Sequence, residues 1–87
     1  MSRHEIPGFS LANKIVIGWD PPLQTFFVQV IDRKAELADR DDKFILWLGT
    51  SLREIYEVEQ LARVVSLFAH VTPAMRATLY ADKDEAR

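Results

Sequence analysis

The sequence contains no cysteine in its 87 residues, which excludes disulfides, thiolate metal ligands and cysteine nucleophiles. A chain without cysteine suits a reducing compartment. No apolar run approaches the roughly 18 residues that a membrane-spanning helix needs. The N-terminal residues also lack the charged-then-apolar pattern of a secretory signal peptide. We therefore expect a cytoplasmic protein with no membrane partner.

An excess of charge of one sign is also missing. The chain carries 11 lysine and arginine residues against 13 aspartate and glutamate residues, a formal net charge of −2. Proteins that bind nucleic acids usually present a basic face, so this balance argues against a nucleic-acid partner. Hydrophobic residues make up 48% of the chain and charged residues 28%. This composition and length are typical of one globular domain with a modest core.

Patterns that carry chemistry are absent as well. The two histidines, His4 and His70, form no i, i+4 pair, and no carboxylate lies beside either in a recognisable pattern. The serines occur in no nucleophile elbow, and the three glycines form no phosphate-binding loop. Asp39, Asp41 and Asp42 lack the central glycine and distal glutamate of a calcium loop. The sequence predicts no enzyme, no cofactor and no metal. An enzyme without a recognisable motif is the alternative.

One stretch, residues 14–32, predicts a β-hairpin. Residues 15–19 and 25–31 are rich in β-branched and aromatic side chains, which favour strands. The consecutive prolines Pro21 and Pro22 end the first strand, because proline cannot donate to a ladder. If Ile17 lies opposite Val28, then Ile15 meets Val30 and Trp19 meets Phe26, all on one face. A slip by one residue would mix the faces.

This register places Gly18 opposite Phe27. A large ring directly across the ladder can cover the bare backbone of a glycine in a strand. The alternative is a β-bulge at Gly18, which would interrupt the pairing. The residues leave both interpretations open.

Residues 33–42 carry many charges of both signs and predict a solvated connection. The third strand is expected at residues 44–48, where every residue is apolar. A continuous apolar run favours burial on both faces and a central place in the sheet. An order along the sheet that follows the sequence would instead make this strand an edge.

Two helices are expected after the third strand. Ser51 and Glu54 fit a capping box, and an apolar stripe with the helical period follows through residues 55–69. Thr72 and Pro73 favour the start of a second helix, which is expected to end near residue 82 with Met75 and Leu79 in its core. Three ranges result: a flexible N-terminal arm at 1–13, one domain at 14–82 and a frayed tail at 83–87. The alternative for the arm is a segment lying across the sheet.

The predicted fold is α+β, a three-stranded antiparallel β-meander followed by two helices packed on one sheet face (βββαα). Two short helices cover one face, yet both faces of the sheet are apolar, and a large apolar patch in water is unusual for a monomer. We therefore predict a non-enzymatic protein-interaction module that forms a homodimer through its sheet. The alternative is a small regulator or inhibitor that occludes another protein. The candidate partner-binding residues are Phe27, Gln29, Ile31, Ile45 and Trp47.

Two segments carry a resemblance, residues 18–27 (GWDPPLQTFF) and residues 46–50 (LWLGT). They resemble short bacterial proteins, some carried on mobile elements, over about residues 14–80. This resemblance implies no activity, because none is assigned to that group. The order of three strands and a helix, with Gly-Thr-Ser before the helix, also resembles HicB-type antitoxins in layout alone. The DNA-binding appendage of those antitoxins has no counterpart here.

Overall fold

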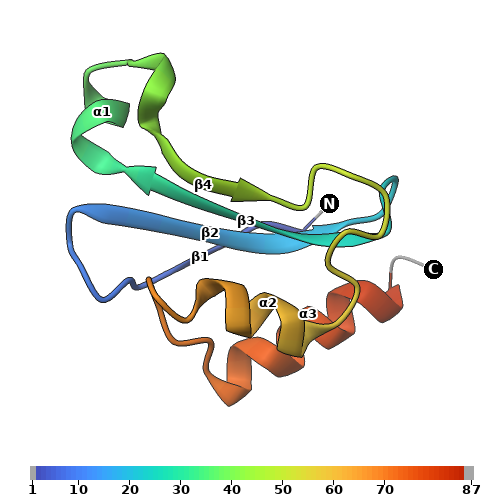
Figure 1. Cartoon of the computed structure of the whole chain (residues 1–87). Helices are drawn as coiled ribbons and strands as arrows, with labels where there is room; N and C mark the ends of the chain where they lie inside the picture. The colour runs from blue at the N-terminus through green and yellow to red at the C-terminus, as the bar shows by residue number, and fades with distance from the viewer. Residues whose placement is uncertain (1, 86–87) are drawn as a thin grey trace.

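The computed structural model describes residues 2–85 and shows a four-stranded antiparallel sheet with two helices packed under one face (Figure 1). The strands follow one another along the sheet in the order β1-β2-β3-β4. The elements are β1 (His4–Ile6), β2 (Asn13–Asp20), β3 (Thr25–Asp32), α1 (Arg33–Leu37), the 3-10 helix η1 (Asp41–Lys43), β4 (Phe44–Leu48), α2 (Val58–Val65) and α3 (Pro73–Glu85). The α+β class is confirmed, with one strand and one short helix more than expected.

The predicted hairpin is confirmed in both its strands and its register. Ile17 lies opposite Val28, and Gly18 lies opposite Phe27 in an uninterrupted β2–β3 ladder. No bulge therefore occurs at Gly18. The Phe27 ring covers this glycine, because its Cε1 atom lies 2.8 Å from where a Gly18 Cβ would stand.

The N-terminal arm contributes β1, which the prediction of a flexible segment missed. His4 lies opposite Ile17 and Ile6 opposite Ile15. Ser2 extends the contact, since its N–H donates to the Trp19 carbonyl at 3.0 Å and its Oγ accepts from the Trp19 N–H at 2.9 Å. A strand of three residues is too short to show a period-2 pattern. Met1 lies outside the described residues.

β4 is an edge strand, so the prediction of a central place is wrong and the sequence-order alternative holds. Leu46 and Leu48 pack against the main core, whereas Ile45 and Trp47 on the other side are each 50% exposed. The ladder shifts between Val30 and Ile31, which is the signature of a β-bulge in β4.

The connection between β3 and β4 contains α1 and η1 rather than a fully irregular loop. Asp32 caps α1, because its Oδ1 accepts from the N–H groups of Lys34 at 3.0 Å and Ala35 at 3.4 Å. Ala35 is buried, so this charged segment is anchored to the end of the sheet.

The main core lies between the sheet and the α2–α3 layer (Figure 1). Its fully buried side chains come from β2, β3, α2 and α3: Ile15, Ile17, Phe26, Val28, Val30, Val58, Leu61, Val65 and Leu79. Full burial of one such side chain contributes about 1.5–3 kcal/mol. This layer is the principal source of stability.

α2 begins at Val58, several residues after the start that Ser51 and Glu54 predicted. The Glu54 carboxylate does accept from the Ser51 N–H at 3.3 Å, but Arg53 has a φ of 54°, which prevents a helix there. The chain is instead held to β3, because the Ile55 N–H donates to the Thr25 Oγ1 at 2.8 Å. The helix then starts where the Gln60 Oε1 accepts from the Glu57 N–H at 3.0 Å.

The predicted start of α3 is confirmed. Pro73 is its first residue, and the Thr72 hydroxyl accepts from the Met75 N–H at 3.1 Å. Leu79 is fully buried and Met75 packs against the same core. The helix continues to Glu85 rather than ending near residue 82, so the first part of the expected frayed tail is helical. Residues 86–87 lie outside the described residues.

Candidate functional site

The sheet face opposite α2 and α3 carries a second, smaller apolar cluster. Val16, Phe27 and Ile31 form it, with Phe44 packed at its side. Phe27 is 5% exposed, Ile31 2% and the neighbouring Gln29 8%. Three of the five predicted partner-binding residues are therefore already buried within one chain.

Long polar side chains flank this cluster, because Glu5 lies opposite Val16 and Lys14 lies opposite Ile31. Their alkyl stems shield apolar neighbours while their charged ends meet a partner in water. Three such pairs bridge the face: Arg3 Nη1 to Gln29 Oε1 at 3.1 Å, Arg33 Nη2 to Glu5 Oε2 at 3.3 Å, and Lys14 Nζ to Glu36 Oε1 at 3.5 Å. The sequence offers the N-terminal arm, another subunit or a different protein as the cover, and Arg3 and Glu5 come from that arm. The individual pairs are not predictable, because each joins segments that are distant in the sequence.

The outer edge of β4 differs from the rest of this face. Ile45 and Trp47 are each 50% exposed, and the Trp47 ring lies against Phe44 with centroids 4.6 Å apart. Within residues 2–85 no strand pairs with this edge. All five residues of β4 are apolar, so neither a proline nor a charge protects its edge, and the bulge in β4 is the feature of the strand that opposes pairing. The strand thus offers unpaired backbone groups beside exposed apolar side chains.

A pocket of about 220 Å³ opens on the same face, beside the C-terminal end of β4. Trp47, Phe27 and Leu23 supply its apolar lining, and Arg3, Asp20 and Gln29 its polar groups. Gly49, with a φ of 85°, brings the backbone after β4 close to Phe27. The site joins three strands and the segment before β1.

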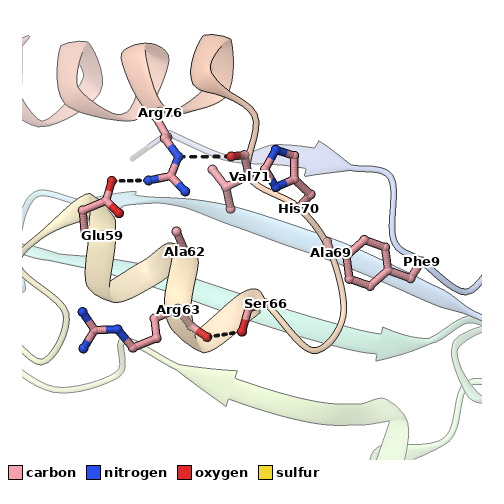
Figure 2. Close-up of a pocket in the computed structure, with 9 residues that line it drawn as sticks. All are labelled: Phe9, Glu59, Ala62, Arg63, Ser66, Ala69, His70, Val71 and Arg76. Atoms are coloured by element: carbon pink, nitrogen blue, oxygen red, sulfur yellow. Dashed lines mark hydrogen bonds and ion pairs between the residues drawn. The ribbon is translucent and has the colours of Figure 1, made fainter.

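A second pocket, of about 260 Å³, lies in the helical layer (Figure 2). Figure 2 shows Arg76 held between two acceptors: its Nε donates to the Val71 carbonyl at 3.1 Å, and its Nη1 pairs with Glu59. The Arg76 hydrogen bond and charge lower the pKa of the Glu59 carboxyl. The Arg63 guanidinium points away from Arg76. The charged groups here tie α2 to α3 and do not converge on a ligand.

His4 has a carboxylate partner that sequence reasoning missed. Its Nε2 lies 2.6 Å from Asp82 Oδ2, so the pair joins β1 to α3 across 78 residues of sequence. Among residues 2–85 no hydroxyl group hydrogen-bonds to this imidazole, and a catalytic triad needs such a nucleophile. The pair links β1 to α3 in the fold.

In the part of the chain that the structure describes, no group of three or more histidine, cysteine, aspartate or glutamate residues could hold a metal ion. None of the helices described is long and apolar enough to cross a bilayer. The outer edge of β4 and the Trp47 pocket thus stand as the candidate functional surfaces.

Comparison with known proteins assigns no family to the chain. No family model, no curated protein and no solved structure matches it. The resemblances noted in the sequence therefore stay expectations, and function has to be argued from the geometry of β4 and its surroundings.

Proposed function

We propose that the protein is a non-enzymatic interaction module that self-associates through the outer edge of β4. One observation carries this proposal: a five-residue, wholly apolar edge strand with an open outer edge among residues 2–85, and with Ile45 and Trp47 each half exposed. Such an edge is a template for pairing with another strand. Burial of the two side chains on association supplies the apolar gain.

A second copy fits this edge by symmetry. If two β4 strands pair antiparallel about Leu46, Trp47 of each copy lies opposite Ile45 of the other. Aromatic and β-branched residues in directly opposed positions stabilise a sheet by about 0.2–1 kcal/mol per pair. A twofold axis repeats every contact, which makes the interface self-complementary and closed. The proposal keeps Ile45 and Trp47 from the predicted set of partner-binding residues. Phe27, Gln29 and Ile31 are buried within one chain and take no part in the interface.

Light scattering on a size-exclusion column tests the proposal. The wild-type chain should elute as a dimer, and Ile45→Lys should elute as a monomer with its fold intact, because a lysine on an edge strand opposes strand pairing. Leu67→Lys is the matched control. Leu67 is 84% exposed in the turn after α2, far from β4 in the fold, and its substitution should leave the dimer unchanged.

Two outcomes would contradict self-association. One is a wild-type monomer at high concentration, and the other is an Ile45→Lys variant that remains a dimer. A wild-type monomer would direct attention to the alternative role, a regulator whose open edge pairs with an extended segment of another protein.

A further inference from the structure

The pocket beside Trp47 contains charges of both signs that do not neutralise one another. Arg3 and Asp20 both line it. The Arg3 guanidinium donates one hydrogen bond to the Gln29 Oε1 atom, which uses one of the five N–H donors of the arginine. In residues 2–85 the Asp20 carboxylate makes no hydrogen bond and no ion pair, with Arg3 or any other residue. Arg3 and Asp20 thus line one cavity without forming an ion pair with each other.

The fold explains this separation. Ser2 bonds to Trp19 and His4 lies opposite Ile17, so Arg3 stands beside Gly18 on the open face of the sheet. From there its side chain reaches across β2 to Gln29 on β3. Asp20 lies two residues after Gly18 on the same face, at the end of β2. Arg3 is therefore held in the segment before β1, and Asp20 at the end of β2.

The rest of the lining combines the polar side chains of Gln29 and Thr50 with apolar surface that includes an accessible ring. Phe27 and Leu23 contribute apolar surface, and the indole of Trp47 is half exposed. Phe44, which contacts Trp47, does not line the pocket. The volume of about 220 Å³ is smaller than the roughly 300–1,000 Å³ of pockets that take drug-sized ligands. The occupant must be small.

We propose that this pocket binds a free α-amino acid with an aromatic side chain. The α-carboxylate pairs with the Arg3 guanidinium, the α-ammonium pairs with Asp20, and the side chain packs on Trp47 and Phe27. A zwitterion satisfies both charged groups, whereas a singly charged ligand leaves one of them without a partner. The ammonium is also attracted to the face of the indole. All of the groups come from one chain, and because the proposed self-association would bury Trp47 against Ile45 of a second copy, ligand binding and self-association compete for this side chain.

Nuclear magnetic resonance with L-phenylalanine as the probe tests the site on the full chain. The indole N–H signal of Trp47 should shift and saturate, while that of Trp19, which is 5% exposed, should stay in place. Two probes dissect the recognition: 3-phenylpropanoate lacks the ammonium and 2-phenylethylamine lacks the carboxylate. Each should bind at least roughly tenfold more weakly than L-phenylalanine, the value of one charged hydrogen bond.

Substitutions assign the two charges. Asp20→Asn should weaken L-phenylalanine roughly tenfold and leave 3-phenylpropanoate unaffected, a difference that a general loss of structure would not produce. Asp39→Asn is the matched control, because Asp39 is exposed, does not line the pocket and has a φ of 54° that asparagine tolerates.

Three results would overturn the proposal. The first is no saturable shift of the Trp47 signal up to the solubility limit of L-phenylalanine. The second is equal affinity for L-phenylalanine and 3-phenylpropanoate. The third is a shift with adenosine and none with L-phenylalanine, which would assign the pocket to a planar heterocycle.

Discussion

The two faces of the sheet reach a similar degree of burial by different means. On one face, apolar side chains of α2 and α3 pack against β2 and β3. On the other, Val16, Phe27 and Ile31 pack with Phe44 and are flanked by pairs of long polar side chains. Long charged side chains can thus contribute to the burial of an apolar face, because their stems shield apolar neighbours.

Phe26 and Phe27 of β3 show the difference between the two faces of the sheet within one strand. They are adjacent in β3, point to opposite faces, and are 0% and 5% exposed. Phe26 is enclosed by the core and stacks edge-on with Trp19 at 4.8 Å between centroids. Phe27 borders the Trp47 pocket. The two rings are thus buried to a similar degree in different surroundings. Phe26 lies inside the core, whereas Phe27 lies beside a pocket.

The largest expected effect comes from truncating these two rings. Phe26→Ala should lower the free energy of unfolding by about 4 kcal/mol, because it leaves a cavity in a packed core. Phe27→Ala should cost about 2 kcal/mol, since water from the adjoining pocket can enter the space and only the burial of the ring is lost. Urea denaturation at equilibrium measures both values.

The milder pair Phe26→Leu and Phe27→Leu serves as the control if Phe26→Ala does not fold, and it should keep the same order. Equal losses for the two positions would mean that the polar cover is as dry and as well packed as the helical layer. The contrast between the two faces would then be wrong.

The hairpin shows how much of this fold is predictable from sequence. The register of β2 and β3, with Ile17 opposite Val28 and Phe27 over Gly18, is set by local alternation and by a proline-rich turn. The cover of the open face is not predictable in this way. It depends on Arg3, Lys14 and their partners, and exposed charges at such positions are typical of any solvated surface.

Long-range contacts account for the other misses. β1 is three residues long, and His4 meets Asp82 only because the folded chain brings its two ends together. The start of α2 was placed too early because Ser51 and Glu54 form the same local pattern as a true cap. Of the candidate site, the sequence identifies Trp47 and Ile45 as apolar residues on a strand, but not the pocket that Arg3 and Asp20 complete.

A smaller effect is expected at Thr25, which holds the segment leading from β4 to α2. Thr25 is fully buried, and its hydroxyl accepts from the Ile55 N–H at 2.8 Å and lies 3.1 Å from the Ile55 carbonyl. Thr25→Val keeps the shape but leaves the Ile55 N–H without this acceptor, at a cost of about 1–2 kcal/mol. Thr25→Ser retains the hydroxyl and is the control for urea denaturation. Equal stability of the valine variant and the wild type would contradict this role.

The smallest expected effect on stability concerns Glu59 and Arg76, which lie on the solvent side of the helical layer. This polar pair joins α2 to α3. The hydrogen bond from Arg76 lowers the pKa of Glu59, so the folded state favours the ionised carboxylate. The stabilisation is therefore fully present above the usual carboxyl pKa and is lost as the pH falls through the lowered value. Arg76→Met should raise the pKa of Glu59, as followed by its side-chain resonance in a pH titration.

The free energy of unfolding should depend on pH in the same direction as the ionisation of Glu59. The part of the difference between wild type and Arg76→Met that depends on Glu59 should be present at neutral pH and disappear in acid. The part due to the Arg76 bond to the Val71 carbonyl should persist at both pH values, because that acceptor does not titrate. Glu59→Gln separates the two, since it should remove only the pH-dependent part. A Glu59 titration unchanged by Arg76→Met would show that the pair at the surface is too mobile to act, and would leave apolar packing as the sole tie between α2 and α3.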